Sequence, residues 1–327
     1  MARRLPVYFL IDTSESMAGA AMDAVAEGLA ALVATMQSDP RCIETVYVSI
    51  ITFGATAKVA VPLTPVGDLL VPALRLGTGT KLGSALELLL SRFKCEVRTR
   101  RNAEERADYC PICFLLSDGT PTDDWRGAAA KVRALHDTGR CLVAALACGN
   151  DADVDTLRSI TPHVVRGSAE VSALSAFFRW ATASVRAASV AMDGAAESLL
   201  AAVPKGLGSA ACDIEVAGHH PAMFIITQCQ RMRLPCVLKH RWNGTIFEAT
   251  SSVAVDGIEM SKGSGVEVDS SKISILPCPR CANPLWARCS CGQHFCCASD
   301  RGRFTCPWCE LAADYQPTNF SFNSSAG

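Results

Sequence analysis

The sequence lacks the features that mark several common protein classes. No apolar run reaches the roughly 18 residues of a membrane-spanning helix, although 49% of the 327 residues are hydrophobic. The formal net charge is only −1, so no overall attraction to nucleic acid or to an anionic membrane is expected. The basic start of the chain precedes a short apolar run without a small-residue cleavage site. We therefore expect a cytoplasmic protein.

Motifs of common enzymes are missing too. The chain has no G-x-S-x-G nucleophile elbow and no phosphate-binding P-loop, and residues 77–83 have the wrong glycine spacing for a dinucleotide fingerprint. A phosphatase of the haloacid-dehalogenase type would need a second carboxylate where Ser14 stands. His136 and His163 are better explained as structural or exposed residues than as bases. We expect a non-catalytic protein, with a metal-dependent hydrolase or phosphatase as the first alternative.

What the sequence does contain begins with an apolar run, residues 7–11, that stops at Asp12. Hydroxyl side chains follow at Ser14 and Ser16. The run has the length of a strand buried on both faces of a parallel sheet, and ligands bind at the carboxyl ends of such strands. One carboxylate and two hydroxyls suit a hard cation, Mg²⁺ or alternatively Mn²⁺ or Ca²⁺. Taken alone, Asp12 could equally be a turn former or a helix cap.

Two further stretches complete this pattern. A glycine-rich segment, residues 77–83, opens an expected helix and leaves Thr80 to offer a hydroxyl. A second apolar strand, residues 112–117, ends on a carboxylate followed by glycine. The order D-x-S-x-S, then T, then D-G resembles the metal-ion-dependent adhesion site of von Willebrand factor A (VWA) domains. That resemblance implies a cation bound by Asp12, Ser14, Ser16, Thr80 and Asp118.

Strands and helices alternate over the first part of the chain, which predicts an α/β fold with a doubly wound, mostly parallel sheet. The expected strands are 7–11, 46–53, 58–63, 112–117, 141–148 and 163–165. The expected helices are 18–36, 66–74, 82–93, 122–137, 154–159 and 171–187. We divide the chain into a VWA domain at 1–188, a helical segment and linker at 189–210, a β-rich segment at 211–275, a zinc-ribbon-like cysteine cluster at 276–312 and a flexible tail at 313–327.

The β-rich segment contains three strand-like runs, residues 222–229, 234–242 and 245–255. Asn243-Gly244 separates the last two runs and predicts a tight hairpin. Residues 262–271 are expected to form a loop.

Eight of the 17 cysteines lie within residues 278–309, including two C-P-x-C motifs. Such motifs are typical of the knuckles that hold structural zinc, whereas a redox C-x-x-C would need a thioredoxin-like βαβ pattern. The other nine cysteines are scattered, and we interpret them as free thiols of a reducing compartment.

A three-stranded meander over 286–289, 294–296 and 303–305 would place the two C-P-x-C motifs at opposite ends of a small sheet. We therefore favour two zinc ions. The expected ligands are Cys278, Cys281, Cys296 and Cys297 for one ion, and Cys289, Cys291, Cys306 and Cys309 for the other. The alternatives are one zinc between the two motifs, or His294 in place of Cys296 or Cys297. A zinc-ribbon nucleic-acid-binding protein is the second functional alternative, although only four Arg and three acidic residues occur after residue 277.

The order of these segments is similar to that of the TerY-like tellurium-resistance proteins of bacteria. The stretch L-L-S-D-G-T-P-T-D-D-W at 115–125 matches that family, apart from Ser117, where Thr is common. The tandem Cys296-Cys297 is less usual for it. The resemblance implies a non-catalytic adaptor of a stress-response phosphorylation module, with a Ser/Thr kinase and a metal-dependent protein phosphatase as partners. The bound cation would bridge to an acidic or phosphorylated group of the partner.

Overall fold

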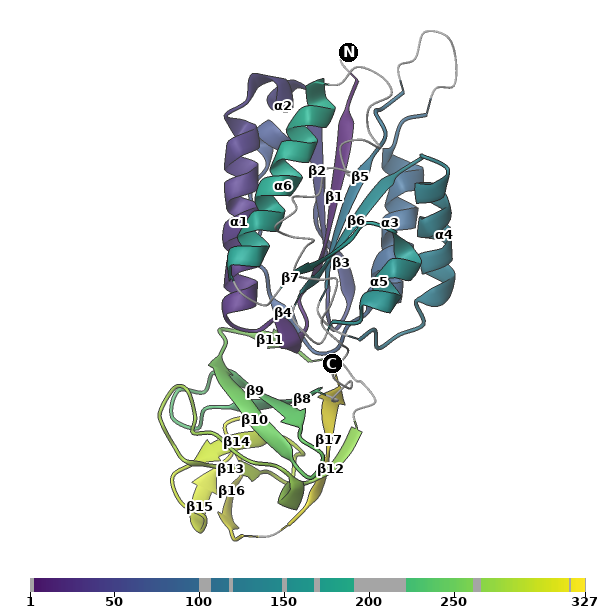
Figure 1. The fold of residues 1–327 in the computed structure, drawn as a ribbon. Helices are drawn as coiled ribbons and strands as arrows, with labels where there is room; N and C mark the ends of the chain where they lie inside the picture. The colour runs from purple at the N-terminus through teal and green to yellow at the C-terminus, as the bar shows by residue number, and fades with distance from the viewer. Residues whose placement is uncertain are drawn as a thin grey trace. The chain divides into compact units, whose positions relative to one another are not determined.

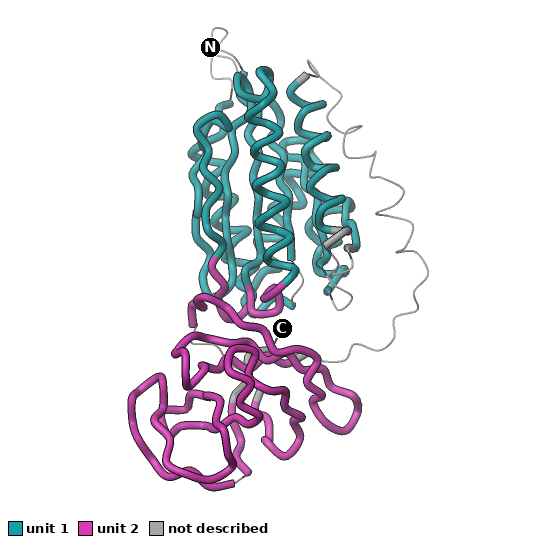
Figure 2. Tube along the Cα trace, turned by 90° about the vertical axis from the view of Figure 1, so that its left-hand side faces the viewer, with its two compact units in different colours: residues 1–13, 20–74, 80–217 teal, residues 14–19, 75–79, 218–327 magenta. Residues whose placement is uncertain are grey.

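The computed structural model describes residues 3–99, 107–117, 120–148, 152–167, 171–190, 222–260, 266–317 and 319–326. The chain forms two compact units, coloured separately in Figure 2. Unit 1 comprises residues 1–13, 20–74 and 80–217, and unit 2 comprises residues 14–19, 75–79 and 218–327. Two short segments from early in the chain therefore belong with the C-terminal part. Residues 191–210 of the expected helical segment and linker lie outside the described residues.

Unit 1 contains the expected parallel sheet, in the order β3-β2-β1-β5-β6-β7. All neighbouring strands run parallel except β3, which pairs antiparallel with β2 at one edge. The strands are β1 (Leu5–Asp12), β2 (Val46–Phe53), β3 (Ala57–Pro65), β5 (Ile112–Ser117), β6 (Leu142–Cys148) and β7 (Val164–Gly167). The predicted fold class is thus confirmed.

Helices cover both faces of this sheet (Figure 1). One face carries α1 (Ala20–Gln37), α2 (Pro40–Thr45) and α6 (Val171–Val190). The other face carries α3 (Leu82–Glu96), α4 (Arg126–Asp137) and α5 (Val154–Ile160). The helix expected over 66–74 is only the 3-10 turn η2 (Val66–Asp68). Pro72 lacks an N–H and restricts the residue before it, which explains why the helix does not continue.

The core of unit 1 forms around β1, in which all eight residues are buried. A strand covered by helices on both faces needs apolar side chains on both, which explains the uninterrupted run in the sequence. On one face, Phe9 stacks on Phe114 with ring centroids 5.2 Å apart, and Phe177 of α6 meets Phe114 edge to face at 5.9 Å. The apolar part of the strand ends at its carboxyl end, where the buried residue is the charged Asp12.

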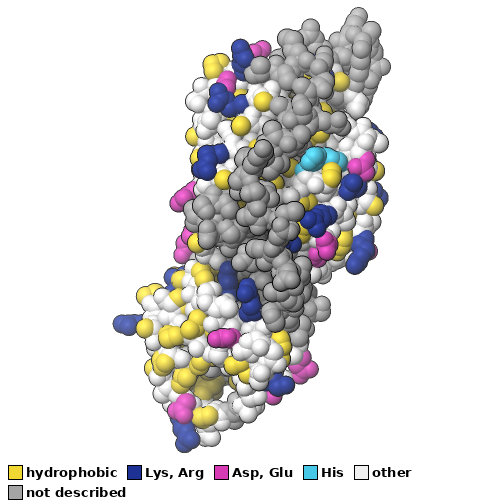
Figure 3. All heavy atoms as spheres, in the orientation of Figure 1, with side chains coloured by type: hydrophobic (Ala, Val, Ile, Leu, Met, Phe, Trp, Pro, Cys, Tyr) yellow, Lys and Arg dark blue, Asp and Glu magenta, His cyan; other side chains and the backbone are white. Residues whose placement is uncertain are grey.

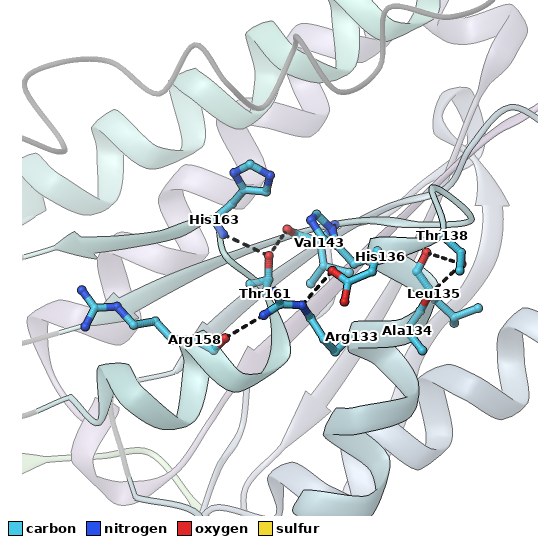
Figure 4. A network of polar contacts seen from close by, with 10 residues as sticks. Arg133, Ala134, Leu135, His136, Thr138, Val143, Arg158, Thr161 and His163 are labelled. Atoms are coloured by element: carbon cyan, nitrogen blue, oxygen red, sulfur yellow. Dashed lines mark hydrogen bonds and ion pairs between the residues drawn. The ribbon is translucent and has the colours of Figure 1, made fainter.

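Figure 4 shows a polar network at β6 and β7 that accounts for two of the histidines. The His136 Nδ1 accepts a hydrogen bond from the Val143 backbone N–H at 3.1 Å. Thr161 donates its hydroxyl to the Val143 carbonyl at 2.6 Å and accepts from the His163 N–H at 3.1 Å. The two imidazole rings lie 5.1 Å apart. Both histidines therefore take part in local packing around the start of β6, as expected for structural residues.

Unit 2 is built on a sheet whose main path is β10-β9-β8-β14-β13. Its strands are β8 (Ala222–Gln228), β9 (Pro235–Trp242), β10 (Phe247–Ala254), β13 (Leu285–Arg288) and β14 (His294–Cys297). The expected hairpin joins β9 to β10, and Gly244 supplies the positive φ of its turn at 100°. Because β8 pairs with both β9 and β14, the β-rich segment and the cysteine cluster share one sheet rather than forming separate parts.

Three expectations for unit 2 differ from the structure. The third strand of the meander, β15 (Gly302–Thr305), pairs with β16 (Ala312–Tyr315) instead of β14. The loop expected over 262–271 contains β12 (Val266–Asp269), which pairs with β17 (Ser321–Ala326). The tail expected to be flexible therefore holds two strands. The tail was expected to be flexible because most of its residues are polar. Phe322, however, is 5% exposed and packs in a cluster with Met223 and Ile225.

The packing of α1 against α6 gives a stability prediction. A Cβ added at Gly28 of α1 would lie 2.2 Å from the Phe178 ring, so Gly28→Ala should destabilise the protein by about 1–3 kcal/mol through overpacking. Gly127 of α4 has nothing within 4 Å of such a Cβ, so Gly127→Ala should stabilise by up to about 1 kcal/mol. Urea unfolding followed by circular dichroism measures both, and equal shifts of the same sign would contradict the packing described.

Candidate metal sites

The carboxylate of Asp12 is fully buried at the end of β1. Its Oδ2 accepts a hydrogen bond of 2.6 Å from the hydroxyl of Ser117, the last residue of the neighbouring strand β5. The next residue, Thr13, is held to β2, because its backbone N–H donates to the Phe53 carbonyl at 2.7 Å. A buried charge is costly unless opposite charge compensates it. The Asp12 carboxylate is an oxygen donor of the kind that a divalent cation takes, which makes the end of β1 a candidate position for one.

Thr80 lies just before α3 and is 1% exposed. Its backbone is fixed by Thr122, whose hydroxyl accepts from the Thr80 N–H at 3.0 Å and whose own N–H donates to the Thr80 carbonyl at 2.9 Å. The Thr80 hydroxyl itself has no hydrogen-bond partner among the described residues. A buried polar group left unpaired costs about 1–3 kcal/mol. A metal ligand is a physical role that would satisfy this oxygen.

Unit 2 contains the other two hydroxyls of the expected site. The Oγ atoms of Ser14 and Ser16 lie 2.8 Å apart. Between them Glu15 is 1% exposed, and its Oε2 accepts a hydrogen bond of 2.6 Å from the Gly79 N–H. Ser14 also forms a parallel bridge with Gly77. The loop of the D-x-S-x-S motif is thus fastened to the glycine-rich segment that leads to Thr80.

Four of the five expected cation ligands are described, and Asp118 lies outside the described residues. Asp12 and Thr80 belong to unit 1, whereas Ser14 and Ser16 belong to unit 2. The carboxylate and hydroxyl in unit 1, and the two adjacent hydroxyls in unit 2, are oxygen donors of the kind that Mg²⁺, Mn²⁺ or Ca²⁺ takes. The supporting residues Ser117, Thr122 and Glu15 were not predicted from sequence, although Ser117 was noted as a departure from the family.

The cysteines of unit 2 form two groups of four thiols. In each group the ligand atoms all lie within 4.8 Å of one another: Cys229, Cys278, Cys281 and Cys296 in the first, and Cys289, Cys291, Cys306 and Cys309 in the second. Zn–S bonds of about 2.3 Å put the sulfurs of a tetrahedral site about 3.8 Å apart. The Sγ atoms of Cys281 and Cys296 are 3.5 Å apart, and those of Cys289 and Cys309 are 3.6 Å apart. Both groups therefore have dimensions that fit zinc.

The second group is the expected set, but in the first group Cys229 stands where sequence analysis placed Cys297. Adjacent residues of a strand point to opposite faces of the sheet. On β14, Cys296 packs with Cys278 and Cys229, whereas Cys297 packs in another cluster with Phe295 and Cys306. His294 is in neither thiol group.

The turn at Cys229 has the backbone geometry of the C-P-x-C knuckles. At Cys229 the N–H of residue i+4 donates to the carbonyl of residue i at 2.8 Å, and the N–H of residue i donates to the carbonyl of residue i+5 at 2.9 Å. Cys278 and Cys306 form the same pair of bonds. The i+4 residue has positive φ in all three turns: 54° at Arg233, 59° at Ala282 and 62° at Glu310. Because this turn holds one cysteine instead of two, no C-x-x-C motif reveals it in the sequence.

A fifth thiol, Cys236 of β9, lies against the first group. Burial raises its pKa to about 12. It therefore stays protonated at neutral pH and behaves as a small apolar side chain. The buried Cys113 of β5 has its pKa raised to about 12 by burial as well. These two scattered cysteines match the interpretation as free thiols.

The sequence of unit 1 defines a class of protein. The profile of the von Willebrand factor type A domain matches residues 7–178, which is more than half of the chain. The protein therefore belongs to the von Willebrand factor type A domain family, a family of metal-dependent protein–protein interaction modules. No curated protein matches the sequence. Among the described helices, none is long and apolar enough to span a membrane.

Several solved structures are similar in fold to this chain. Proximal thread matrix protein 1 from the mussel byssus is 18% identical over 55% of this chain and 48% of its own, with a TM-score of 0.42. It has also been solved with zinc in its metal-ion-dependent adhesion motif, with the same identity, coverage and TM-score. A von Willebrand factor type A protein from Catenulispora acidiphila is 14% identical over 80% of this chain and 68% of its own, with a TM-score of 0.39. The chain spans about half the length of the mussel protein.

We predict that the purified protein carries two zinc ions per chain and that Cys229→Ser lowers this to about one, because a structural zinc site needs four ligands. Cys297→Ser is the matched control on the opposite face of β14 and should retain both ions. Inductively coupled plasma mass spectrometry of dialysed protein measures the content. Loss of zinc from the Cys297→Ser protein, with both ions retained in Cys229→Ser, would contradict the grouping in the structure.

Proposed function

We propose that this protein is a non-catalytic adaptor that binds a protein partner through a divalent cation. In this proposal Asp12, Ser14, Ser16, Thr80 and Asp118 hold Mg²⁺, or alternatively Mn²⁺ or Ca²⁺. The observation that carries it is the fully buried Asp12 carboxylate, together with the unpaired, buried hydroxyl of Thr80. Carboxylate and hydroxyl oxygens are the ligands that such a cation takes, and binding it would satisfy the Thr80 hydroxyl, which costs free energy while it is unpaired.

The chemistry of the donor set explains why the cation would recruit a partner. Mg²⁺ commonly combines one or two protein carboxylates with water and other ligands. Where a neutral water fills a coordination position, the metal still attracts an anionic oxygen that can replace it. An Asp or Glu side chain of a partner, or a phosphate group, supplies such an oxygen. The function follows from binding alone and needs no catalytic base.

The finer proposal is a TerY-like role in a bacterial, cytoplasmic stress-response module linked to tellurite resistance. Its partners would be a Ser/Thr kinase and a metal-dependent protein phosphatase. Support comes from the family-like stretch at residues 115–125 and from the two thiol groups. With four thiolates each, the zinc sites would be closed and structural, since catalytic zinc keeps a position open for water or substrate.

Surface charge supports a protein partner rather than nucleic acid. On the face shown in Figure 3, the described basic and acidic side chains are interspersed, without one broad area of positive charge. The net charge of −1 agrees with this distribution. Nucleic-acid binding of the ordinary kind depends on clustered Lys and Arg side chains that neutralise phosphates.

We predict that Asp12→Ala abolishes capture of the purified kinase or phosphatase partner in a pull-down with Mg²⁺, because the variant lacks a charged ligand of the cation. Capture by the unaltered protein should fall to background with EDTA and return when Mg²⁺ is added. Since EDTA also removes zinc, Asp12→Ala with its zinc content intact separates the two metals. Asp23→Ala, at an exposed position of α1, is the control and should bind normally. Capture that persists in both EDTA and Asp12→Ala would refute the metal bridge.

A further inference from the structure

The two thiol groups of unit 2 differ in how far solvent reaches their cysteines. In the first group three cysteines are buried and Cys281 is half-buried. In the second group Cys289 and Cys306 are buried, whereas Cys291 and Cys309 are exposed. A small reagent dissolved in water therefore meets two exposed cysteines in the second group and none in the first.

Each exposed cysteine of the second group has a buried cysteine as a close neighbour. The Sγ of Cys309 lies 3.6 Å from that of Cys289, and the Sγ of Cys291 lies 3.9 Å from that of Cys306. The four sulfurs thus form two pairs, each of one exposed and one buried cysteine. Redox-sensitive cysteines commonly combine access to solvent with a second cysteine that can resolve the oxidised one.

Bound zinc would keep these sulfurs in their reactive form. A thiol that coordinates the metal loses its proton, and the thiolate rather than the thiol is the nucleophile. Thiolate character would then be common to both groups. Because susceptibility to oxidation depends on thiolate character and on exposure, the second group is the one that an oxidant would attack first.

The second group also lies where two sheets of unit 2 meet. Cys289 and Cys291 lie between β13 and β14, and Cys306 and Cys309 lie between β15 and β16. The β15–β16 hairpin is a two-stranded sheet separate from the one that contains β13 and β14. Zinc at this group would therefore connect the hairpin to the main sheet, and oxidation of its ligands would change that connection.

We infer that the second thiol group is an oxidation site. Hydrogen peroxide converts its thiolates into the disulfides Cys289–Cys309 and Cys291–Cys306 and releases the zinc, while the first group keeps its zinc. This inference rests on the two zinc sites and not on the cation of the VWA site. It can therefore fail without affecting the proposed function.

The step at each pair consumes one molecule of hydrogen peroxide. The exposed Cys309 thiolate attacks a peroxide oxygen, so that an S–O bond forms, the O–O bond breaks and the leaving hydroxide takes up a proton to give water. The Cys289 thiolate then attacks the oxidised sulfur, so that the S–S bond forms and the second oxygen leaves as water. The two sulfurs lose two electrons and the peroxide gains them. The same step at the other pair removes the remaining two thiolates from zinc.

The test treats the zinc-loaded, full-length protein with a small excess of hydrogen peroxide. Zinc content, measured by inductively coupled plasma mass spectrometry after dialysis, should fall from two ions per chain to about one. Free thiols are alkylated, the disulfides are reduced, and the thiols released are given a second label. Peptide mass spectrometry should find the second label on the cysteines of the second group and not on those of the first. A thiol reductant and Zn²⁺ should restore the lost ion.

Two variants identify the group from which the ion is lost. Cys229→Ser keeps only the second group complete, so peroxide should remove its remaining ion. Cys291→Ser keeps only the first group complete, and its remaining ion should survive the same treatment.

Four results would overturn the inference. They are retention of both ions by the peroxide-treated unaltered protein, equal loss from the two variants, zinc release without disulfides in the second group, and isolation of the protein without zinc. In each case the pull-down with Asp12→Ala still tests the proposed function separately.

Discussion

The burial of a carboxylate at the end of the central strand is the constraint around which unit 1 is arranged. Every residue of β1 is buried, and Asp12 at its end is buried as well. Transfer of a charge out of water costs several kcal/mol even in a relaxed protein. The Ser117 hydroxyl donates a hydrogen bond but brings no charge. A divalent cation bound there, as proposed, would supply the opposite charge that a buried carboxylate favours.

The segments that carry the metal-site hydroxyls are positioned by backbone more than by side chains. Gly77 pairs with Ser14 on one side and with Glu259 on the other, so three segments of the backbone approach closely there. Glycine permits such an approach because it lacks a Cβ. Gly79, with φ of 79°, then turns the chain toward Thr80. The structure thus explains why glycines occur in this stretch, independently of its resemblance to a motif.

Sequence analysis predicted the features that depend on local pattern. The buried strands, the alternating helices and the hairpin at Asn243-Gly244 follow from periodicity and turn chemistry, and the structure contains them. It missed features that depend on pairing between distant segments. Cys229 approaches Cys296 because β8 and β14 are neighbours, and a parallel pairing of residues so far apart leaves no local pattern in the sequence. The same holds for β11, a two-residue strand whose partner lies about 180 residues earlier in the chain.

The different donors of the two kinds of site imply different roles for their metals. Thiolates are soft ligands that hold zinc in a closed tetrahedron, whereas carboxylate and hydroxyl oxygens suit hard cations that exchange water and ligands. Cys229 follows directly after β8, the strand that pairs with β9, β14 and β17. Zinc at this group would therefore link the central strand of unit 2 to the cysteine-rich segment. Because the site forms only in the folded protein, the free energy of zinc binding would stabilise the fold. Because Lys239 lies on β9 of that sheet and donates to the Ser16 carbonyl, the zinc would stabilise the framework that holds the Ser14–Ser16 loop.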